Sequence, residues 1–274
     1  MPQNTNLNVS PYFDDFVDSK NYHKVLFKPG FPVQARELTT LQSILQNQVE
    51  KFGQHFFKEG SMVIPGGTTY DNEYFSVKID PNFLNIPVSN YTKVLVDNAI
   101  RIKGETSGAE AVVVNRITSS ESVDGFDTLY VKYTKSGEDG VTSAFLDGEN
   151  LITLSNINYL NTSITADSQF ARCIVSDATS VGSAFSVSEG IYFIRGFFVT
   201  NVTSTIILDQ YTNEPSYRVG FLLKEETIGP SSVNSDLYDN AKGFSNESAP
   251  GADRFKLTTV LHKKLLTDTD DGDF

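Results

Sequence analysis

Three pairs of adjacent carboxylates are the side chains of this 274-residue chain best suited to acid–base chemistry: Asp14-Asp15, Glu225-Glu226 and Asp270-Asp271. Two carboxyl groups at the right separation can hydrolyse a glycosidic bond, one as acid and the other as base or nucleophile. Neighbouring residues of a strand point in opposite directions, so an adjacent pair does not reach that separation by itself. A polysaccharide or peptidoglycan hydrolase stays open as an alternative, and we predict no catalytic residue.

The other reactive side chains are few and poorly spaced for catalysis or metal binding. Cys173 is the only cysteine and lies in the mainly apolar run 171–175, which is typical of a buried structural thiol. No two of His23, His55 and His262 lie at the spacing of metal ligands. The chain has no nucleophile-elbow, phosphate-loop or dinucleotide-binding motif. We therefore predict that the protein is not an enzyme and has no metal site and no cofactor.

The charge balance argues against nucleic-acid and membrane partners. The formal net charge is −12, the pI is near 4.7, and Lys263-Lys264 is the only basic pair. Binding to a phosphate backbone needs clustered Lys and Arg. The apolar runs fall short of the ~20 residues of a membrane helix, and the N-terminus lacks the basic and apolar regions of a signal peptide. We expect synthesis in the cytoplasm, no nucleic-acid binding and no membrane insertion.

The clearest element is an amphipathic helix over residues 34–58. Apolar residues recur there at intervals of three and four, between Pro32 and Gly60. In a heptad frame Gln48 falls on the apolar seam, where a polar residue fixes register or oligomer state; the alternative is a solvated amide on an ordinary helix. We predict an oligomerising core helix that buries Leu41, Leu45, Phe52 and Phe56 and uses Leu38, Leu41, Leu45, Gln48, Phe52 and Phe56.

Residues 1–30 precede this helix as an extended arm that is rich in aromatic residues. Pro11, Pro29 and Gly30 interrupt regular structure there. An arm with so many apolar side chains must pack on its own chain or on a neighbour. We predict docking through Tyr12, Phe13, Phe16, Tyr22 and Phe27.

After the helix the apolar period changes from 3.6 to 2, which predicts a mainly β (α+β) protein with one long N-terminal helix packed on strands. Residues 31–92 would form the helix and the first strands of the body. Residues 93–156 combine short apolar runs, including 94–96, with glycine turns, which favours a small all-β barrel module. Residues 157–266 would complete a β-rich body, and 267–274 an acidic, mobile tail.

Five sequence blocks point to a family. They are Phe27-Lys28-Pro29-Gly30-Phe31-Pro32-Val33-Gln34-Ala35-Arg36-Glu37-Leu38, Leu41-Gln42-Ser43-Ile44-Leu45-Gln46, Lys58-Glu59-Gly60-Ser61-Met62-Val63-Ile64, Tyr192-Phe193-Ile194-Arg195-Gly196-Phe197-Phe198-Val199 and Ala249-Pro250-Gly251-Ala252-Asp253-Arg254-Phe255. In these blocks the chain resembles uncharacterised virion structural proteins of contractile-tailed phages of cyanobacteria. The resemblance implies an oligomeric baseplate or tail-fibre component, and it supplies no catalytic residue.

A second likeness concerns the middle of the chain. Three blocks there are similar to a small β-barrel insert of phage structural proteins: Gly104-Glu105-Thr106-Ser107-Gly108-Ala109, Leu129-Tyr130-Val131-Lys132-Tyr133 and Phe145-Leu146-Asp147-Gly148-Glu149. Members of the larger family are longer than this chain, which implies an N-terminal attachment region. We expect a homo-oligomeric virion protein, either a trimer or repeated copies around a tail, whose partners are baseplate wedge or tail-fibre proteins. The alternatives are a tail-associated polysaccharide depolymerase or peptidoglycan hydrolase and a host receptor-binding module.

Overall fold

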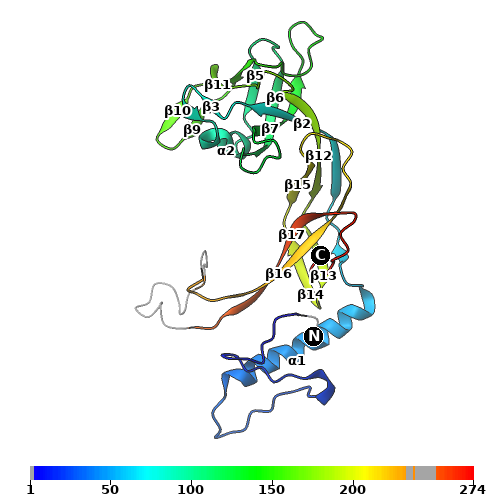
Figure 1. Cartoon of the computed structure of the whole chain (residues 1–274). Coiled ribbons are helices and arrows are strands. Elements are labelled where there is room, and N and C mark those ends of the chain that lie inside the picture. The colour runs from blue at the N-terminus through cyan, green and yellow to red at the C-terminus, as the bar shows by residue number, and fades with distance from the viewer. Residues whose placement is uncertain (1–2, 233–236, 238–250) are drawn as a thin grey trace. The chain divides into compact units, whose positions relative to one another are not determined.

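Figure 1 shows a computed structural model of the chain, which describes residues 3–232, 237 and 251–274. The structure is mainly β with antiparallel sheets, as the sequence predicts. It divides into two compact units. Unit 1 comprises Met1–Thr68, Val187–Ser204 and Arg218–Phe274, and unit 2 comprises Thr69–Ser186 and Thr205–Tyr217. The predicted module 93–156 lies inside unit 2, which extends beyond it at both ends.

Unit 2 is built on an eight-stranded sheet with the strand order β11-β8-β5-β6-β7-β2-β12-β15. The pairing of β6 with β7 places Val113 opposite Val131, and both side chains are buried. The alternating apolar residues of these strands therefore form one wall of the core. The strands are β2 (Thr68–Ile79), β5 (Arg101–Gly104), β6 (Glu110–Ile117), β7 (Asp127–Lys135), β8 (Asn150–Thr153), β11 (Ser168–Arg172), β12 (Thr179–Val187) and β15 (Ser204–Asp209).

The sheet does not close into the expected barrel. The ladder is open, with β11 and β15 at its edges. The chain that follows β11 meets the end of β2 only through an isolated bridge between Cys173 and Ile79 and adjacent backbone hydrogen bonds. Two short hairpins lie beside the sheet, β3 (Asn82–Phe83) with β4 (Ile86–Pro87) and β9 (Ile157–Tyr159) with β10 (Thr162–Ile164).

Residues 94–96 belong to a helix, so the prediction of a strand there, and of an all-β module, is wrong. Helix α2 runs over Ser89–Asp97. Its buried residues include Tyr91 and Leu95, which are four positions apart and so share one helical face. The Tyr91 hydroxyl donates a hydrogen bond to the backbone oxygen of Phe170. Three apolar residues in a row fit either element, so the apolar pattern alone does not decide between helix and strand here.

Unit 1 contains helix α1 (Ala35–Phe56), the three-stranded sheet β1-β13-β14 and the two-stranded ribbon β16-β17. The strands are β1 (Ser61–Ile64), β13 (Gly190–Ile194), β14 (Phe197–Asn201), β16 (Tyr217–Ile228) and β17 (Arg254–Leu265); the 3-10 helix η1 (Asp18–Lys20) lies in the arm. In the described part of the chain no helix, α1 included, is long and apolar enough to cross a membrane.

Residues 190–201 form a hairpin, in which β13 pairs with β14. Arg195 and Gly196 have φ values of 50° and 80° and connect β13 to β14. Two successive residues with positive φ are the hallmark of a tight two-residue hairpin turn. A Cβ atom on Gly196 would also lie 2.7 Å from Cγ of Glu50. Backbone geometry and packing both require glycine at this position.

The two units differ sharply in their cores. Both hydrophobic clusters of the described residues belong to unit 2 and are built from side chains such as Tyr91, Tyr130 and Phe170. In the described part of unit 1 the buried hydrophobic side chains are Ile44, Val187, Tyr192, Phe193 and Val199. A segment of this size normally needs a larger apolar core to fold as an independent unit. Unit 2 therefore has a core of its own, whereas unit 1 buries little apolar surface.

Candidate functional site

Helix α1 turns polar residues toward its own chain and apolar residues toward solvent. Its buried residues are Ser43, Ile44, Asn47, Glu50 and Gly53. Leu38, Leu45, Val49, Phe52 and Phe56 are 43–66% exposed, and Leu41 is half-buried. An ordinary surface helix has the opposite arrangement. The single chain therefore does not bury the predicted core face, and we call Leu38, Leu41, Leu45, Val49, Phe52 and Phe56 the α1 stripe.

Specific contacts explain why the polar face is turned inward. Gly53 lies against Phe193, where an added Cβ would overlap Cε2 of the ring. The side-chain amide of Gln46 donates a 2.7 Å hydrogen bond to the backbone oxygen of Gly196. At the helix start, Glu37 accepts a 2.9 Å hydrogen bond from the backbone N–H of Gln34, as part of a capping box.

The α1 stripe is straight along the helix. Its six residues are separated by five intervals that together span 18 positions, from Leu38 to Phe56. The average interval equals the 3.6 residues per turn of a straight α-helix and differs from the 3.5 of a supercoiled seam. On this geometry Val49 lies about 40° and Gln48 about 60° from the centre of the stripe. The structure thus places Gln48, which is exposed, at the edge of the stripe.

The arm is fixed to α1 at several points. Asp14 is buried and accepts hydrogen bonds from the hydroxyls of Ser43 and Thr40. Farther along, Lys51 forms a 2.6 Å ion pair with Asp18. Figure 1 shows the arm in dark blue beside the helix. Of the predicted docking residues, Tyr12 and Phe16 are half-buried, whereas Phe13, Tyr22 and Phe27 are exposed.

Arg195 ties together three segments that are distant in the sequence. Its guanidinium forms ion pairs of 2.6 Å with Glu225 of β16 and 2.5 Å with Asp273. Glu225 also accepts hydrogen bonds from the backbone N–H groups of Asn4 and Thr5. Partial burial would raise the pKa of Glu225, but the hydrogen bonds from Thr5, Asn4 and Arg195 outweigh it and lower the pKa. Electrostatic contacts of this kind hold unit 1 together where its apolar core is small.

Residues 267–274, the predicted acidic tail, make specific contacts within unit 1. Asp271 accepts two hydrogen bonds of 2.9 Å from Arg218. The ring of Phe274 lies beneath the cations of Arg218 and Lys264, at 5.6 and 5.0 Å. The backbone oxygen of Asp273 accepts a 2.8 Å hydrogen bond from the N–H of Leu223 in β16. The segment therefore packs along the edge of the β16-β17 ribbon.

This packing leaves a pocket of about 400 Å³, which we call the aromatic pocket. Its lining includes the apolar side chains of Tyr192, Ile194, Phe221, Leu223 and Phe274. Glu59, Asp271 and Asp273 add three carboxylates, whereas Arg195 is the one cation of the lining. The lining of the pocket thus combines apolar side chains with more carboxylates than cations.

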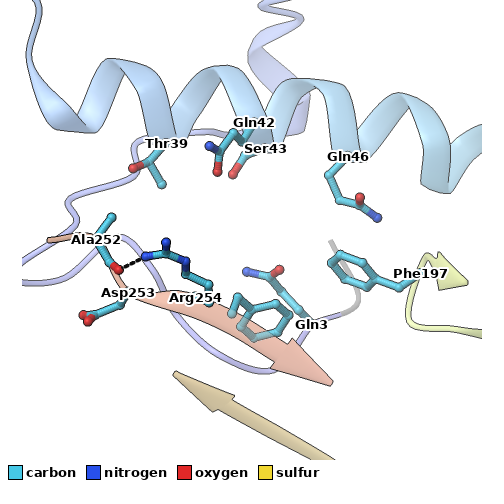
Figure 2. Close-up of a pocket in the computed structure, with 10 residues that line it drawn as sticks. Gln3, Thr39, Gln42, Ser43, Gln46, Phe197, Ala252, Asp253 and Arg254 are labelled. Carbon is cyan, nitrogen blue, oxygen red and sulfur yellow. Dashed lines mark hydrogen bonds between the residues drawn. The ribbon is translucent and has the colours of Figure 1, made fainter. Parts of the chain in front are cut away.

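A second groove, of about 560 Å³, lies between α1 and the start of β17 (Figure 2). Thr39, Gln42, Ser43 and Gln46 project from the helix, and Asp253 and Arg254 lie opposite, with Phe197. Most of these polar groups already have partners within the chain. Asp253 accepts a hydrogen bond from the Tyr12 hydroxyl, Ser43 donates to Asp14, and Arg254 donates to the backbone of Ala252. The groove therefore offers few free polar groups to a ligand.

Two motifs of the middle module meet at one buried carboxylate. Glu149 accepts hydrogen bonds from the N–H groups of Thr106 and Ser107, from the Ser107 hydroxyl and from the N–H of Leu146. A Cβ on Gly104 would lie 2.6 Å from this carboxylate. The sequence blocks 104–109 and 145–149 are thus the halves of one structural turn, a role that sequence reasoning did not find.

A lysine, a tyrosine and an aspartate also converge in unit 2. The Lys78 ammonium lies 2.8 Å from Asp124 and 4.1 Å from the centre of the Tyr211 ring. The Tyr211 hydroxyl donates a 2.8 Å hydrogen bond to Asp124. Partial burial would raise the pKa of Asp124, but hydrogen bonds from Lys78, Ser122 and Tyr211 lower it to about 2. The cluster fixes the loop before β7 to the segment after β15.

The residues considered for catalysis each have a structural environment. Cys173 is buried, and burial raises the pKa of its thiol to about 12. The three carboxylate pairs contribute Asp14, Glu225 and Asp271 to the separate contacts with Ser43, Arg195 and Arg218 described above. Within the described residues no three His, Cys, Asp or Glu side chains form a group that could hold a metal ion.

Comparison with known families gives one match. Residues 10–124 are similar to a family described as a domain of unknown function, DUF4815. No curated protein matches the chain, and no solved structure matches it.

The DUF4815 similarity covers α1 and most of the arm, and it continues into unit 2 as far as Asp124. It includes the block 27–38 and the whole α1 stripe. The Arg195 turn and residues 249–255 lie outside it, and residues 249–250 also lie outside the described structure.

Proposed function

We propose that this chain is a structural component of an oligomeric assembly and acts through contacts between copies. In keeping with the sequence resemblance, we propose a phage tail as that assembly, in which the chain would connect baseplate and tail fibres. The observation that carries the proposal is the α1 stripe, whose apolar side chains face solvent while polar side chains of the same helix face the chain.

An apolar stripe of this length has a free-energy cost in water. Burying one Leu or Phe side chain contributes about 1.5–3 kcal/mol, and five residues of the stripe are more than 40% exposed. The core of unit 1 is small, so covering the stripe would add a substantial part of the stability of that unit. Contiguous exposed apolar surface of this kind marks a protein interface.

The charge distribution favours a second copy of the chain as the occupant. Two molecules with a net charge of −12 repel each other, and the repulsion at close contact is smallest where they meet on an uncharged surface. The α1 stripe contains no charged residue, and Gln42 and Gln48 flank it. A glutamine amide both donates and accepts hydrogen bonds, so identical surfaces can pair through it. The stripe is therefore suited to self-association.

Mass in solution tests the proposal. The wild-type chain should be oligomeric by light scattering, and Leu45→Asp should reduce it to monomers because a carboxylate would be buried in the interface. Leu160→Asp is the matched control, since Leu160 is 86% exposed in unit 2. Its φ of 48° also tolerates aspartate. A monomeric wild-type chain, or an oligomer that Leu45→Asp leaves intact, would contradict self-association through α1.

The phage assignment needs a separate experiment. Antibodies against the chain should label the baseplate region of intact particles in electron microscopy. Labelling of the head, or of no particle component, would remove the tail assignment and leave the self-association proposal to stand on the mass measurement.

A further inference from the structure

We propose that the outer arm, residues 19–34, of one copy docks into the aromatic pocket of a second copy. This inference rests on the proposed function, because it requires the chain to assemble with itself. It assigns a role to a segment and a pocket that the α1 stripe does not explain.

The outer arm has the composition of a docking peptide. Five of its large apolar side chains are 47–79% exposed: Tyr22, Leu26, Phe27, Phe31 and Val33. Beyond the end of η1 the segment has no helix or strand, and one turn is closed by a hydrogen bond from the N–H of Phe31 to the backbone oxygen of Lys28. Pro29 and Pro32 restrict the backbone. A segment with a restricted backbone loses less entropy when it binds.

The outer arm is also the basic part of an acidic protein. Residues 19–34 contain Lys20, Lys24 and Lys28 and no Asp or Glu. The rest of the chain is correspondingly more negative than the total of −12. Complementary charge steers such a segment toward acidic surfaces of another copy.

The aromatic pocket has the matching chemistry. Tyr192 and Phe221 form an edge-on aromatic pair in the pocket, with ring centres 4.9 Å apart. The side chain of Phe27 or Phe31 could pack against this pair. Of the pocket's three carboxylates, Asp273 is paired with Arg195 and Asp271 with Arg218, whereas Glu59 forms no ion pair within the described residues. An aromatic side chain next to Lys28 would therefore find an apolar site with the carboxylate of Glu59 at its edge.

The occupant comes from another copy in this inference because the pocket is not lined by the arm of its own chain. None of the residues that line it belongs to segment 19–34. The same chain instead uses residues 4 and 5 to reach Glu225 beside the pocket. Within the same chain Tyr22, Lys24 and Val25 line a small pocket together with residues of α1 such as Thr40 and Ile44. The exposed part of the outer arm, residues 26–33, is the part that can extend to a neighbour that the α1 stripe brings close.

Cross-linking between two differently tagged full-length chains tests the docking. One chain carries Leu26→Cys in the outer arm, and the other carries Leu223→Cys at the pocket. The native Cys173 is buried and its pKa is raised, so a short bismaleimide should react with the engineered thiols. After co-expression, a cross-linked species that contains both tags is expected.

Two controls make the result specific. Replacing the pocket cysteine by Val141→Cys, at a site 82% exposed in unit 2, should remove the mixed product. Adding Lys20→Glu, Lys24→Glu and Lys28→Glu to the arm chain should also remove it, with the oligomer mass unchanged. A mixed product no stronger than with Val141→Cys, from chains that are oligomeric by mass, would overturn the docking and leave the proposed function intact. Monomeric chains would instead overturn the proposed function, and the docking with it.

Discussion

Glu149 shows how a single residue organises the middle of the chain. Its carboxylate accepts four hydrogen bonds while only 5% of the residue is exposed. Glu149→Gln would turn an amide donor toward groups that are themselves donors. Because buried donors would lose a charged acceptor, we expect unit 2 to lose about 3 kcal/mol of unfolding free energy. Urea unfolding followed by the tyrosine signal measures this loss.

Glu138→Gln is the control for that substitution. The Glu138 side chain is 84% exposed and makes a 3.8 Å ion pair with Lys103. Exposed pairs contribute about 0–1 kcal/mol, so the control should unfold close to the wild type. Equal losses in the two variants would mean that the Glu149 hydrogen bonds do not hold the turn.

The Lys78–Asp124–Tyr211 cluster predicts an acid-sensitive contribution to stability. The pKa of Asp124 is about 2 in the folded chain, below the ordinary value of 3.8. Asp124 therefore stabilises the fold above its ordinary pKa, and this contribution disappears as the pH falls from about 4 to 2. Asp124→Asn lacks it at every pH. The difference in melting temperature between wild type and variant should shrink over that range, and a constant difference would contradict the assignment.

At the residue scale the sequence supports part of this picture. The blocks around Gly104 and Glu149 stand out as motifs, but their meeting depends on pairing between distant strands, which local composition does not encode. Arg195 gives even less signal, since one arginine in an apolar run has no partner visible in the sequence.

Helix α1 raises a conflict between helix propensity and packing at Gly53. Alanine is a better helix former by about 1 kcal/mol. The new Cβ would overlap the ring of Phe193, which is fully buried and has no room to move. Overpacking costs about 1–3 kcal/mol, so we expect Gly53→Ala to destabilise unit 1. Thermal unfolding followed by the helix signal in circular dichroism measures the effect.

A second substitution identifies the cause. Phe193→Leu shortens the side chain that Gly53→Ala would strike. Gly53→Ala should therefore cost less when it is combined with Phe193→Leu than in the wild type, and a double-mutant cycle gives the coupling directly. No coupling between the two sites would show that the loss arises elsewhere in the helix.

At the element scale the 3.6-residue period predicts helix 34–58, and the structure has α1 over Ala35–Phe56. The period does not determine which face the chain covers, and here Ser43 and Asn47 are buried while Phe52 is exposed. Sequence patterns assume that apolar faces turn inward. That assumption does not hold for α1 in the single chain, and the proposed self-association would account for the difference.

At the scale of the whole molecule, the two units differ in how much apolar surface their described residues bury. Unit 2 encloses the main hydrophobic cluster, whereas the described part of unit 1 buries five hydrophobic side chains. The sequence predicts the mainly β class correctly, because alternation and glycine turns are local features. It does not predict the division into units, since unit 1 joins three separate stretches of the chain.

This asymmetry predicts that the two units unfold differently. If copies associate through unit 1, mass action makes its stability depend on protein concentration, while unit 2 should melt at a fixed temperature. Hydrogen exchange resolves them: amides of α1 should become more protected as concentration rises, and those of β6 and β7 should not change. Leu45→Asp should make exchange in α1 fast at every concentration, because the stripe would stay exposed. Concentration-independent protection of α1 would mean that the contacts within one chain already stabilise unit 1, despite its small core.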